Sequence, residues 1–182
     1  MSEIETRCLE AFPKWLAALN EDAVALSSLL TAESIPDRAR RHVAGALNYL
    51  FKSLDLIPDG VEELGYLDDA FVLRIASRLA IRDVPEAREA DIRGVLARLA
   101  QDVDLVEQLL ETDYGKLEKY VRALEKGAAR GRTVDEIMAE PSARSAILRD
   151  VQQWARSYSA PTLSGGANSL VKLRAFLSAK LA

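Results

Sequence analysis

Apolar residues recur every three or four positions along most of this chain of 182 residues, which is the period of an amphipathic helix. The first stripe consists of Ile4, Cys8, Phe12, Trp15 and Leu19. Similar stripes follow in the segments 38–52, 71–79, 92–110, 117–124, 147–158 and 170–181. No segment shows the strict alternation that is typical of a strand. The pattern predicts an all-α fold, a single-domain multi-helix bundle of about eight helices.

Local signals predict where these helices begin and end. Pro13 removes a backbone donor inside the first stripe, so we expect it to kink that helix or to split it, with a second helix over residues 21–30. Thr133 and Glu136 have the spacing of a capping box at the start of a short helix. The segment 159–168, SAPTLSGGAN, has the composition of a linker and precedes a last helix.

The most regular apolar pattern lies between Glu86 and Glu111. Its members alternate steps of four and three, as in a heptad repeat: Ile92, Leu96, Leu99, Val103, Val106 and Leu110. A heptad seam of this length is typical of a core helix in a bundle. The alternative interpretation is a coiled-coil homodimer, which usually needs three to four heptads.

Composition and charge restrict the class of protein. Hydrophobic residues make up 49% of the chain and charged residues 29%, which suits one globular domain over residues 1–182. The formal net charge is −4 and the pI is about 5.2. Nucleic-acid-binding domains usually carry a basic patch and a high pI, so we expect no nucleic-acid partner.

Cysteine content and the N-terminal segment bear on the compartment. Cys8 is the only cysteine, so the chain can form neither an internal disulfide nor a thiolate zinc site. The segment MSEIETRCLE carries acids where a signal peptide has a basic region and an apolar run. No stretch has the length of about 18 uncharged apolar residues that a membrane span requires. We expect a cytoplasmic protein without a transmembrane segment.

One stretch in the middle of the chain concentrates acidic side chains between two predicted helices. The pattern predicts a helix-turn-helix hairpin over residues 37–81, at the centre of the bundle. Its turn contains Asp55, Asp59, Asp68 and Asp69, with Glu62 and Glu63 between them.

Two interpretations of these carboxylates stay open. In the structural one, the side chains cap helices and close the turn, with Asp68 or Asp69 as the cap of the second helix. In the functional one, Asp55, Asp59, Asp68 and Asp69 converge and offer oxygen ligands to a hard cation such as Mg²⁺ or Ca²⁺. A metal held there could activate water for hydrolysis. His42 is the only histidine, so His-based triad chemistry is excluded.

The same stretch resembles a known family. Asp55-Leu56-Ile57-Pro58-Asp59, followed by Gly65-Tyr66-Leu67-Asp68-Asp69, is similar in order and spacing to the YkvA-like family, the domain of unknown function numbered 1232. The resemblance implies a fold unit and no known reaction. Many members look membrane-associated through this hairpin. The chain has Lys52-Ser53-Leu54 where the family often has Ser-Pro-Ile, which makes the region more polar.

The sequence favours a non-catalytic interaction or adaptor module with a protein partner. Arg74, Arg78 and Arg82, spaced by four residues on one helix face, and the acidic turn are the candidate contact surfaces. The first alternative is a metal-dependent hydrolase or metal-binding protein that uses the Asp cluster. The second is a peripheral membrane protein, which only the family resemblance suggests.

Overall fold

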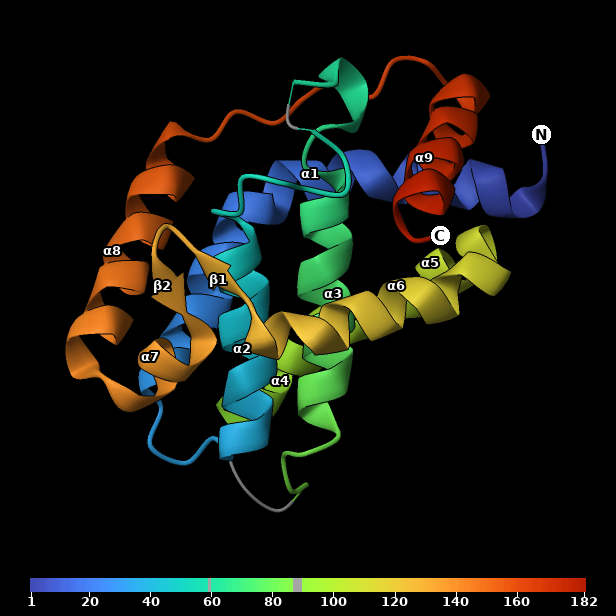
Figure 1. The fold of residues 1–182 in the computed structure, drawn as a ribbon. Coiled ribbons are helices and arrows are strands. Elements are labelled where there is room, and N and C mark those ends of the chain that lie inside the picture. Colours follow the sequence, from blue (N-terminus) through green and yellow to red (C-terminus); the bar gives the residue numbers. More distant parts are fainter. Residues whose placement is uncertain (59, 87–89) are drawn as a thin grey trace.

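The computed structural model describes residues 1–58, 60–86 and 90–182, and it confirms the all-α prediction (Figure 1). The described α-helices are α1 (Glu3–Ser28), α2 (Asp37–Tyr49), α3 (Leu67–Ile81), α4 (Ala90–Ala100), α5 (Val103–Leu110), α6 (Thr112–Ala123), α7 (Val134–Ala139), α8 (Pro141–Ser157) and α9 (Ala167–Lys180). Short 3₁₀ helices are η1 (Leu29–Thr31), η2 (Glu62–Leu64) and η3 (Leu124–Lys126). Strands β1 (Ala128–Ala129) and β2 (Arg132–Thr133) pair antiparallel; two residues each are too short to leave an alternating pattern.

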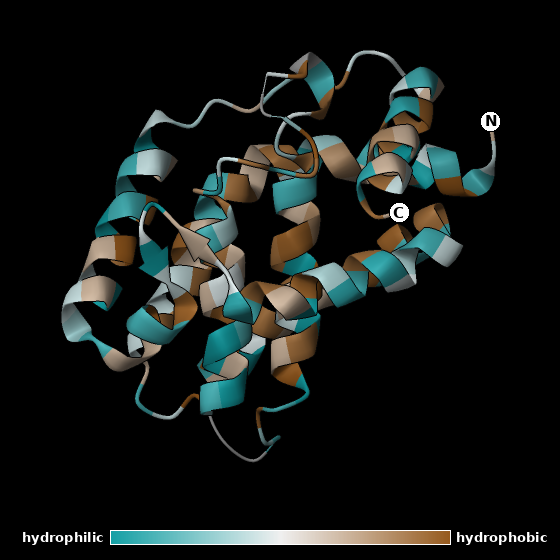
Figure 2. Cartoon of the chain, in the orientation of Figure 1, coloured by the Kyte–Doolittle hydropathy of each residue, from teal (hydrophilic) through white to brown (hydrophobic). Residues whose placement is uncertain are grey.

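Helix α3 lies at the centre of the bundle, as Figure 1 shows. Thirteen of its fifteen residues are buried, because α1, α2, α4, α5 and α6 all pack against it. The ring of Phe71 on this helix lies 5.3 Å from that of Phe12 and 6.1 Å from that of Trp15, both on α1. A helix covered on all sides is apolar on all sides, and Figure 2 shows α3 mostly in brown with polar colour on the outer helices.

Helix α1 continues through Pro13, so the predicted split and the separate helix over 21–30 are wrong. The proline ring lies on the exposed side of the helix, where its missing N–H costs one backbone hydrogen bond. Phe12, Trp15 and Leu16 on the opposite side are buried. Burial of these side chains on both sides of the proline outweighs the lost bond.

The heptad pattern does not form one helix. α4 ends at Ala100 and α5 begins at Val103, so the prediction of a single core helix is wrong in this respect. All six seam residues are nevertheless buried inside this chain. The seam therefore faces the protein's own core, and a coiled-coil dimer could use it only if the bundle opened.

Helices α7 and α8, which follow the two strands, begin where the sequence signals predicted. Thr133 caps α7 through a capping box with Glu136, as predicted. Pro141 opens α8. Residues 158–166 have no regular structure and lead into α9, which packs against α1, α6 and η2.

Candidate functional site

The turn between α2 and α3 is held by one buried carboxylate. Asp68, which is 1% exposed, accepts hydrogen bonds from the Tyr49 hydroxyl at 2.5 Å and from the Ile57 amide at 3.1 Å. The Tyr49 oxygen in turn accepts a hydrogen bond from the Leu56 amide at 2.8 Å. Two buried backbone donors of the turn are thus satisfied by side chains, which is what a buried turn requires.

Asp68 does not cap α3, and neither does Asp69, so that part of the structural interpretation is wrong. The helix begins at Leu67, and its N-cap residue is Tyr66, which makes no capping bond through its side chain. Both aspartates lie in the first turn, where a negative charge favours the helix dipole. The Asp68 carboxylate accepts hydrogen bonds from the Tyr49 hydroxyl and the Ile57 amide of the turn instead.

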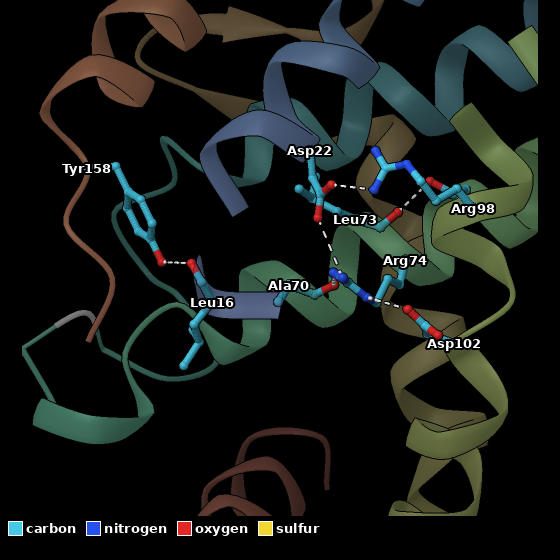
Figure 3. Close-up of polar contacts among 9 residues, drawn as sticks. Leu16, Asp22, Ala70, Leu73, Arg74, Arg98, Asp102 and Tyr158 are labelled. Carbon is cyan, nitrogen blue, oxygen red and sulfur yellow. Dashed lines mark hydrogen bonds and ion pairs between the residues drawn. The ribbon is translucent and has the colours of Figure 1, made fainter. Parts of the chain in front are cut away.

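Tyr66 adopts a left-handed backbone conformation, with φ at 71°. Its ring packs against that of Trp154, in the last turn of α8, at 6.3 Å and against that of Tyr158, the residue after α8, at 5.3 Å. The Tyr158 hydroxyl donates to the Leu16 carbonyl on α1 at 2.7 Å (Figure 3). Burial, and then the nearby Tyr66 and Asp69, raise the pKa of Tyr158. Ring packing onto α8, and the hydrogen bond of Tyr158 to α1, therefore hold the turn in place.

The electrostatics of the Tyr49–Asp68 pair oppose proton transfer by the tyrosine. Burial raises the pKa of Tyr49 far above its ordinary value, and the Asp68 charge raises it further. The hydroxyl therefore keeps its proton at physiological pH and acts as a fixed donor.

The structure describes three of the four aspartates that the sequence grouped as metal ligands. Asp68 and Asp69 are buried and Asp55 is half-buried; each of the three has an interaction partner. Asp59 lies outside the described residues. Within the described parts of the chain, no group of three or more His, Cys, Asp or Glu side chains is arranged to hold a metal ion. A site for Mg²⁺ or Ca²⁺ at this turn stays a prediction.

Glu63 has a role that sequence reasoning missed. Its Oε2 accepts hydrogen bonds from the Gly165 amide at 2.6 Å and from the Ser169 hydroxyl at 2.8 Å, and Lys172 Nζ lies 3.7 Å from its Oε1. The Ser169 hydroxyl, and then the Gly165 amide, lower the pKa of Glu63. The partners lie more than a hundred positions away in the sequence, so no local pattern could indicate them.

Arg74 does not belong to a contact surface, contrary to the arginine-face interpretation. The residue is 3% exposed. Its guanidinium lies 3.5 Å from Asp22 and 3.7 Å from Asp102 (Figure 3). The centre of the Trp15 ring lies 4.3 Å away. Burial lowers the pKa of Arg74 to about 10, although Asp22 acts in the opposite direction. Arg98 also pairs with Asp22, at 2.8 Å.

Arg78 is likewise engaged within the chain. It lies 3.1 Å from Asp104 and 3.3 Å from Glu107, both on α5. Arg82, just past the end of α3, is the one member of the row that the structure shows exposed. The arginine row thus mainly holds α3 to its neighbours.

A second feature adjoins the turn. Residues 51–54 and 128–131 line an open cleft of about 410 Å³, here called the Leu54 cleft. Leu54 stands at its edge with 79% of its surface exposed. Arg130 stacks on the Phe51 ring at 4.6 Å, and Lys52 lies 5.2 Å from the Tyr120 ring and 3.1 Å from its hydroxyl. The cleft thus combines an apolar edge with two fixed cations.

Fold and turn together define an all-helical protein built on a central helix-turn-helix hairpin. Residues 39–75 match the family model described as "Protein of unknown function (DUF1232)". The match confirms the resemblance that the Asp-Leu-Ile-Pro-Asp and Gly-Tyr-Leu-Asp-Asp motifs indicated, and the YkvA-like name is consistent with it. The matched segment contains α2 from Ala39 onward, the turn, and α3 as far as Ile75, and hence the whole Tyr49–Asp68 unit.

Other comparisons add no relative. No curated protein and no solved structure matches the chain. Among the helices that the structure describes, none combines the length and the apolar character needed to cross a membrane.

Proposed function

We propose that this protein is a non-catalytic interaction module that binds a protein partner at the Leu54 cleft. The observation that carries the proposal is Leu54 itself, a large apolar side chain that is 79% exposed beside a cleft of about 410 Å³. Exposed apolar side chains are common singly. Beside a cleft, however, such a side chain can act as an anchor in an interface.

The charges around the cleft indicate the chemistry of the partner. Lys52 and Arg130 are each placed by an aromatic ring, and ordering before binding lowers the entropic cost of a contact. Asp150 offsets part of this charge, since it lies 3.7 Å from Arg130. The cleft suits a protein segment that places an apolar side chain against Leu54 and Phe51 and a carboxylate near the two cations.

The aspartates of the turn support the non-catalytic part of the proposal. Asp68 accepts two hydrogen bonds from the protein, and the raised pKa of Tyr49 keeps that hydroxyl protonated. Groups held in this way satisfy buried donors of the turn, which favours a structural role for the pair over a catalytic one.

A matched pair of substitutions tests the proposal. Leu54→Asp removes the anchor, while Val171→Asp makes the same change at another exposed apolar residue, which is 62% exposed on α9. Cross-linking in an extract of the source organism identifies a partner, which is then purified and titrated by calorimetry. We expect Leu54→Asp to weaken its binding by about tenfold or more and Val171→Asp to leave it unchanged.

Two outcomes would contradict the proposal. One is equal binding of both variants to every partner that the parent protein captures. The other is flotation of the parent, and not of Leu54→Asp, with vesicles that contain anionic lipid, in the absence of a protein partner. That result would replace the protein partner with a membrane surface.

A further inference from the structure

Helix α9 lies in a groove of the bundle and buries one face there. Leu170, Leu173 and Leu177 are almost fully buried, and steps of three and four place them on one helix face. The groove is formed by α1, α6 and η2. Only the irregular segment 158–166 joins α9 to the rest of the chain, and Figure 1 shows this segment crossing the outside of the bundle.

Polar contacts fix the direction of α9 in this groove. At its N-terminal end, Glu63 accepts from the Gly165 amide and the Ser169 hydroxyl and lies near Lys172. These contacts use a backbone amide, a hydroxyl and an ammonium group. They are groups that a helix from another protein can also supply.

A surface crevice runs along one side of α9. An open crevice of about 330 Å³ separates Arg174, Ala175 and Ser178 of α9 from the junction of α5 and α6 at residues 109–113. On the outer face of α9, Val171 and Lys172 are exposed. One side of α9 therefore borders solvent, and its apolar contact with the bundle is made through the buried leucines.

We propose that this groove is a helix-binding site that α9 occupies within its own chain. The partner that fits is an amphipathic helix with apolar side chains at the positions of Leu170, Leu173 and Leu177 and a hydroxyl at the position of Ser169. Helix-in-groove recognition uses anchors at this spacing. The site lies on a different face from the Leu54 cleft, and the proposal does not depend on the proposed function.

The segment 158–166, which tethers α9, determines when a helix from a partner can replace α9 in the groove. A short flexible linker holds its helix at an effective concentration in the millimolar range. A helix from a partner therefore binds well only when it fits better than α9 or when docking of α9 is weakened. In the intact chain α9 acts as an autoinhibitory occupant.

Cys8 offers a reporter for the state of the groove. It is the only cysteine, and it is fully buried on α1, against which α9 packs. Burial raises the pKa of its thiol to about 11, while the charge of Arg174 on α9 acts in the opposite direction. Departure of α9 would expose the thiol to a reagent, so the rate of Cys8 modification measures the opening of the groove.

The experiment weakens the docking of α9 in the full chain and then adds α9 back as a separate peptide. The variant is Leu173→Glu, the probe is a fluorescent peptide of residues 164–182, and Val171→Glu on the outer face is the control. We expect Cys8 of Leu173→Glu to react about tenfold faster or more than in the parent. Added peptide should restore protection, and its anisotropy should rise with the variant at concentrations where it does not rise with the parent. Val171→Glu should behave as the parent.

Peptide specificity completes the design. A peptide that itself carries Leu173→Glu should neither bind nor protect. The proposal is overturned if Leu173→Glu unfolds cooperatively but does not bind the parent-sequence peptide, or if Cys8 reacts no faster in that variant.

A second protein covers the case in which Leu173→Glu does not fold. A protease site replaces residues 159–163, so that the linker is cut after the protein has folded with α9 in place. Excess labelled peptide should then replace the cut helix within hours. Retention of the original helix through gel filtration, with no uptake of peptide over days, would show that α9 is a permanent part of the fold.

Discussion

The Tyr49 hydroxyl and the Asp68 carboxylate share a hydrogen bond of 2.5 Å that joins the last turn of α2 to the first turn of α3. The same two side chains accept the amides of Leu56 and Ile57. The hairpin and its turn therefore form one hydrogen-bonded unit. The family match covers this unit, and the hydrogen bonds give Asp68 of the motif a role in the folding of the turn.

The first prediction concerns the strength of this unit. Asp68→Ala leaves the Tyr49 hydroxyl and the Ile57 amide buried without an acceptor, and we expect it to lower the free energy of unfolding by about 3 kcal/mol. Tyr49→Phe loses one donor and one acceptor and should cost about 2 kcal/mol. Urea denaturation measures both. Losses below about 0.5 kcal/mol in both variants would mean that the unit does not hold the turn.

The second prediction separates the structural interpretation of the turn from metal binding. Because Asp68 is buried and its carboxylate already accepts protein donors, we expect millimolar Mg²⁺, Ca²⁺ or Mn²⁺ to leave the melting temperature unchanged. The double variant Asp55→Asn with Asp69→Asn serves as the control. A ligand that binds only the folded state stabilises it. A metal-dependent rise in the parent that is lost in the variant would therefore support the metal site and justify a hydrolase screen.

The third prediction uses two glycines in helices. A Cβ at Gly45 of α2 would lie 3.2 Å from the backbone of Leu124, whereas a Cβ at Gly94 of α4 would meet nothing within 4 Å. Gly45→Ala forces η3 away and should destabilise the protein by about 1–3 kcal/mol. Gly94→Ala should stabilise it by up to about 1 kcal/mol through helix propensity. Equal effects of the two changes in thermal melts would contradict the close approach of α2 to η3.

Sequence periodicity predicted the helices because burial of one helix face is a local property of the chain. It located the heptad residues in the core, yet it missed the break between α4 and α5, since both helices continue the same apolar spacing. It read Arg74 as part of a polar face, because a buried ion pair with Asp22 leaves no trace in the local pattern. The contact of Glu63 with Ser169 joins distant segments and could not be predicted from spacing at all.

The fourth prediction concerns the strained backbone at Tyr66, where φ is 71°. Tyr66→Ala and Tyr66→Gly both remove the ring that packs on Tyr158 and Trp154. Only alanine keeps the cost of a left-handed conformation, which is about 1–2 kcal/mol for an L-residue. We expect Tyr66→Gly to be the more stable variant by chemical denaturation, in reverse of the usual order inside helices. An alanine variant that is more stable would mean that the turn relaxes when the ring is absent.

The fifth prediction is a pH dependence of α9 docking. Contacts with Ser169 and Gly165 lower the pKa of Glu63 below its ordinary value of 4.5. A carboxyl group with a lowered pKa in the docked state stabilises docking above pH 4.5, and this contribution is lost as the pH falls through the lowered value. Cys8 should therefore become more accessible in acid, as measured with 4,4′-dithiodipyridine, a thiol reagent that works at low pH.

A substitution at Glu63 identifies the group responsible for this effect. Asp113 on α6 faces the C-terminal end of α9. Its pKa is also lowered, mainly by Lys116 and to a lesser extent by Ser178 of α9. Acid alone therefore protonates carboxylates at both ends of α9. Glu63→Gln removes only the titration near Ser169. We expect this variant to show higher Cys8 accessibility at neutral pH and a smaller change between neutral pH and pH 3.5 than the parent. An identical pH profile in the two proteins would assign the effect to Asp113 or to the bundle as a whole, and Glu63 would then not control the docking of α9.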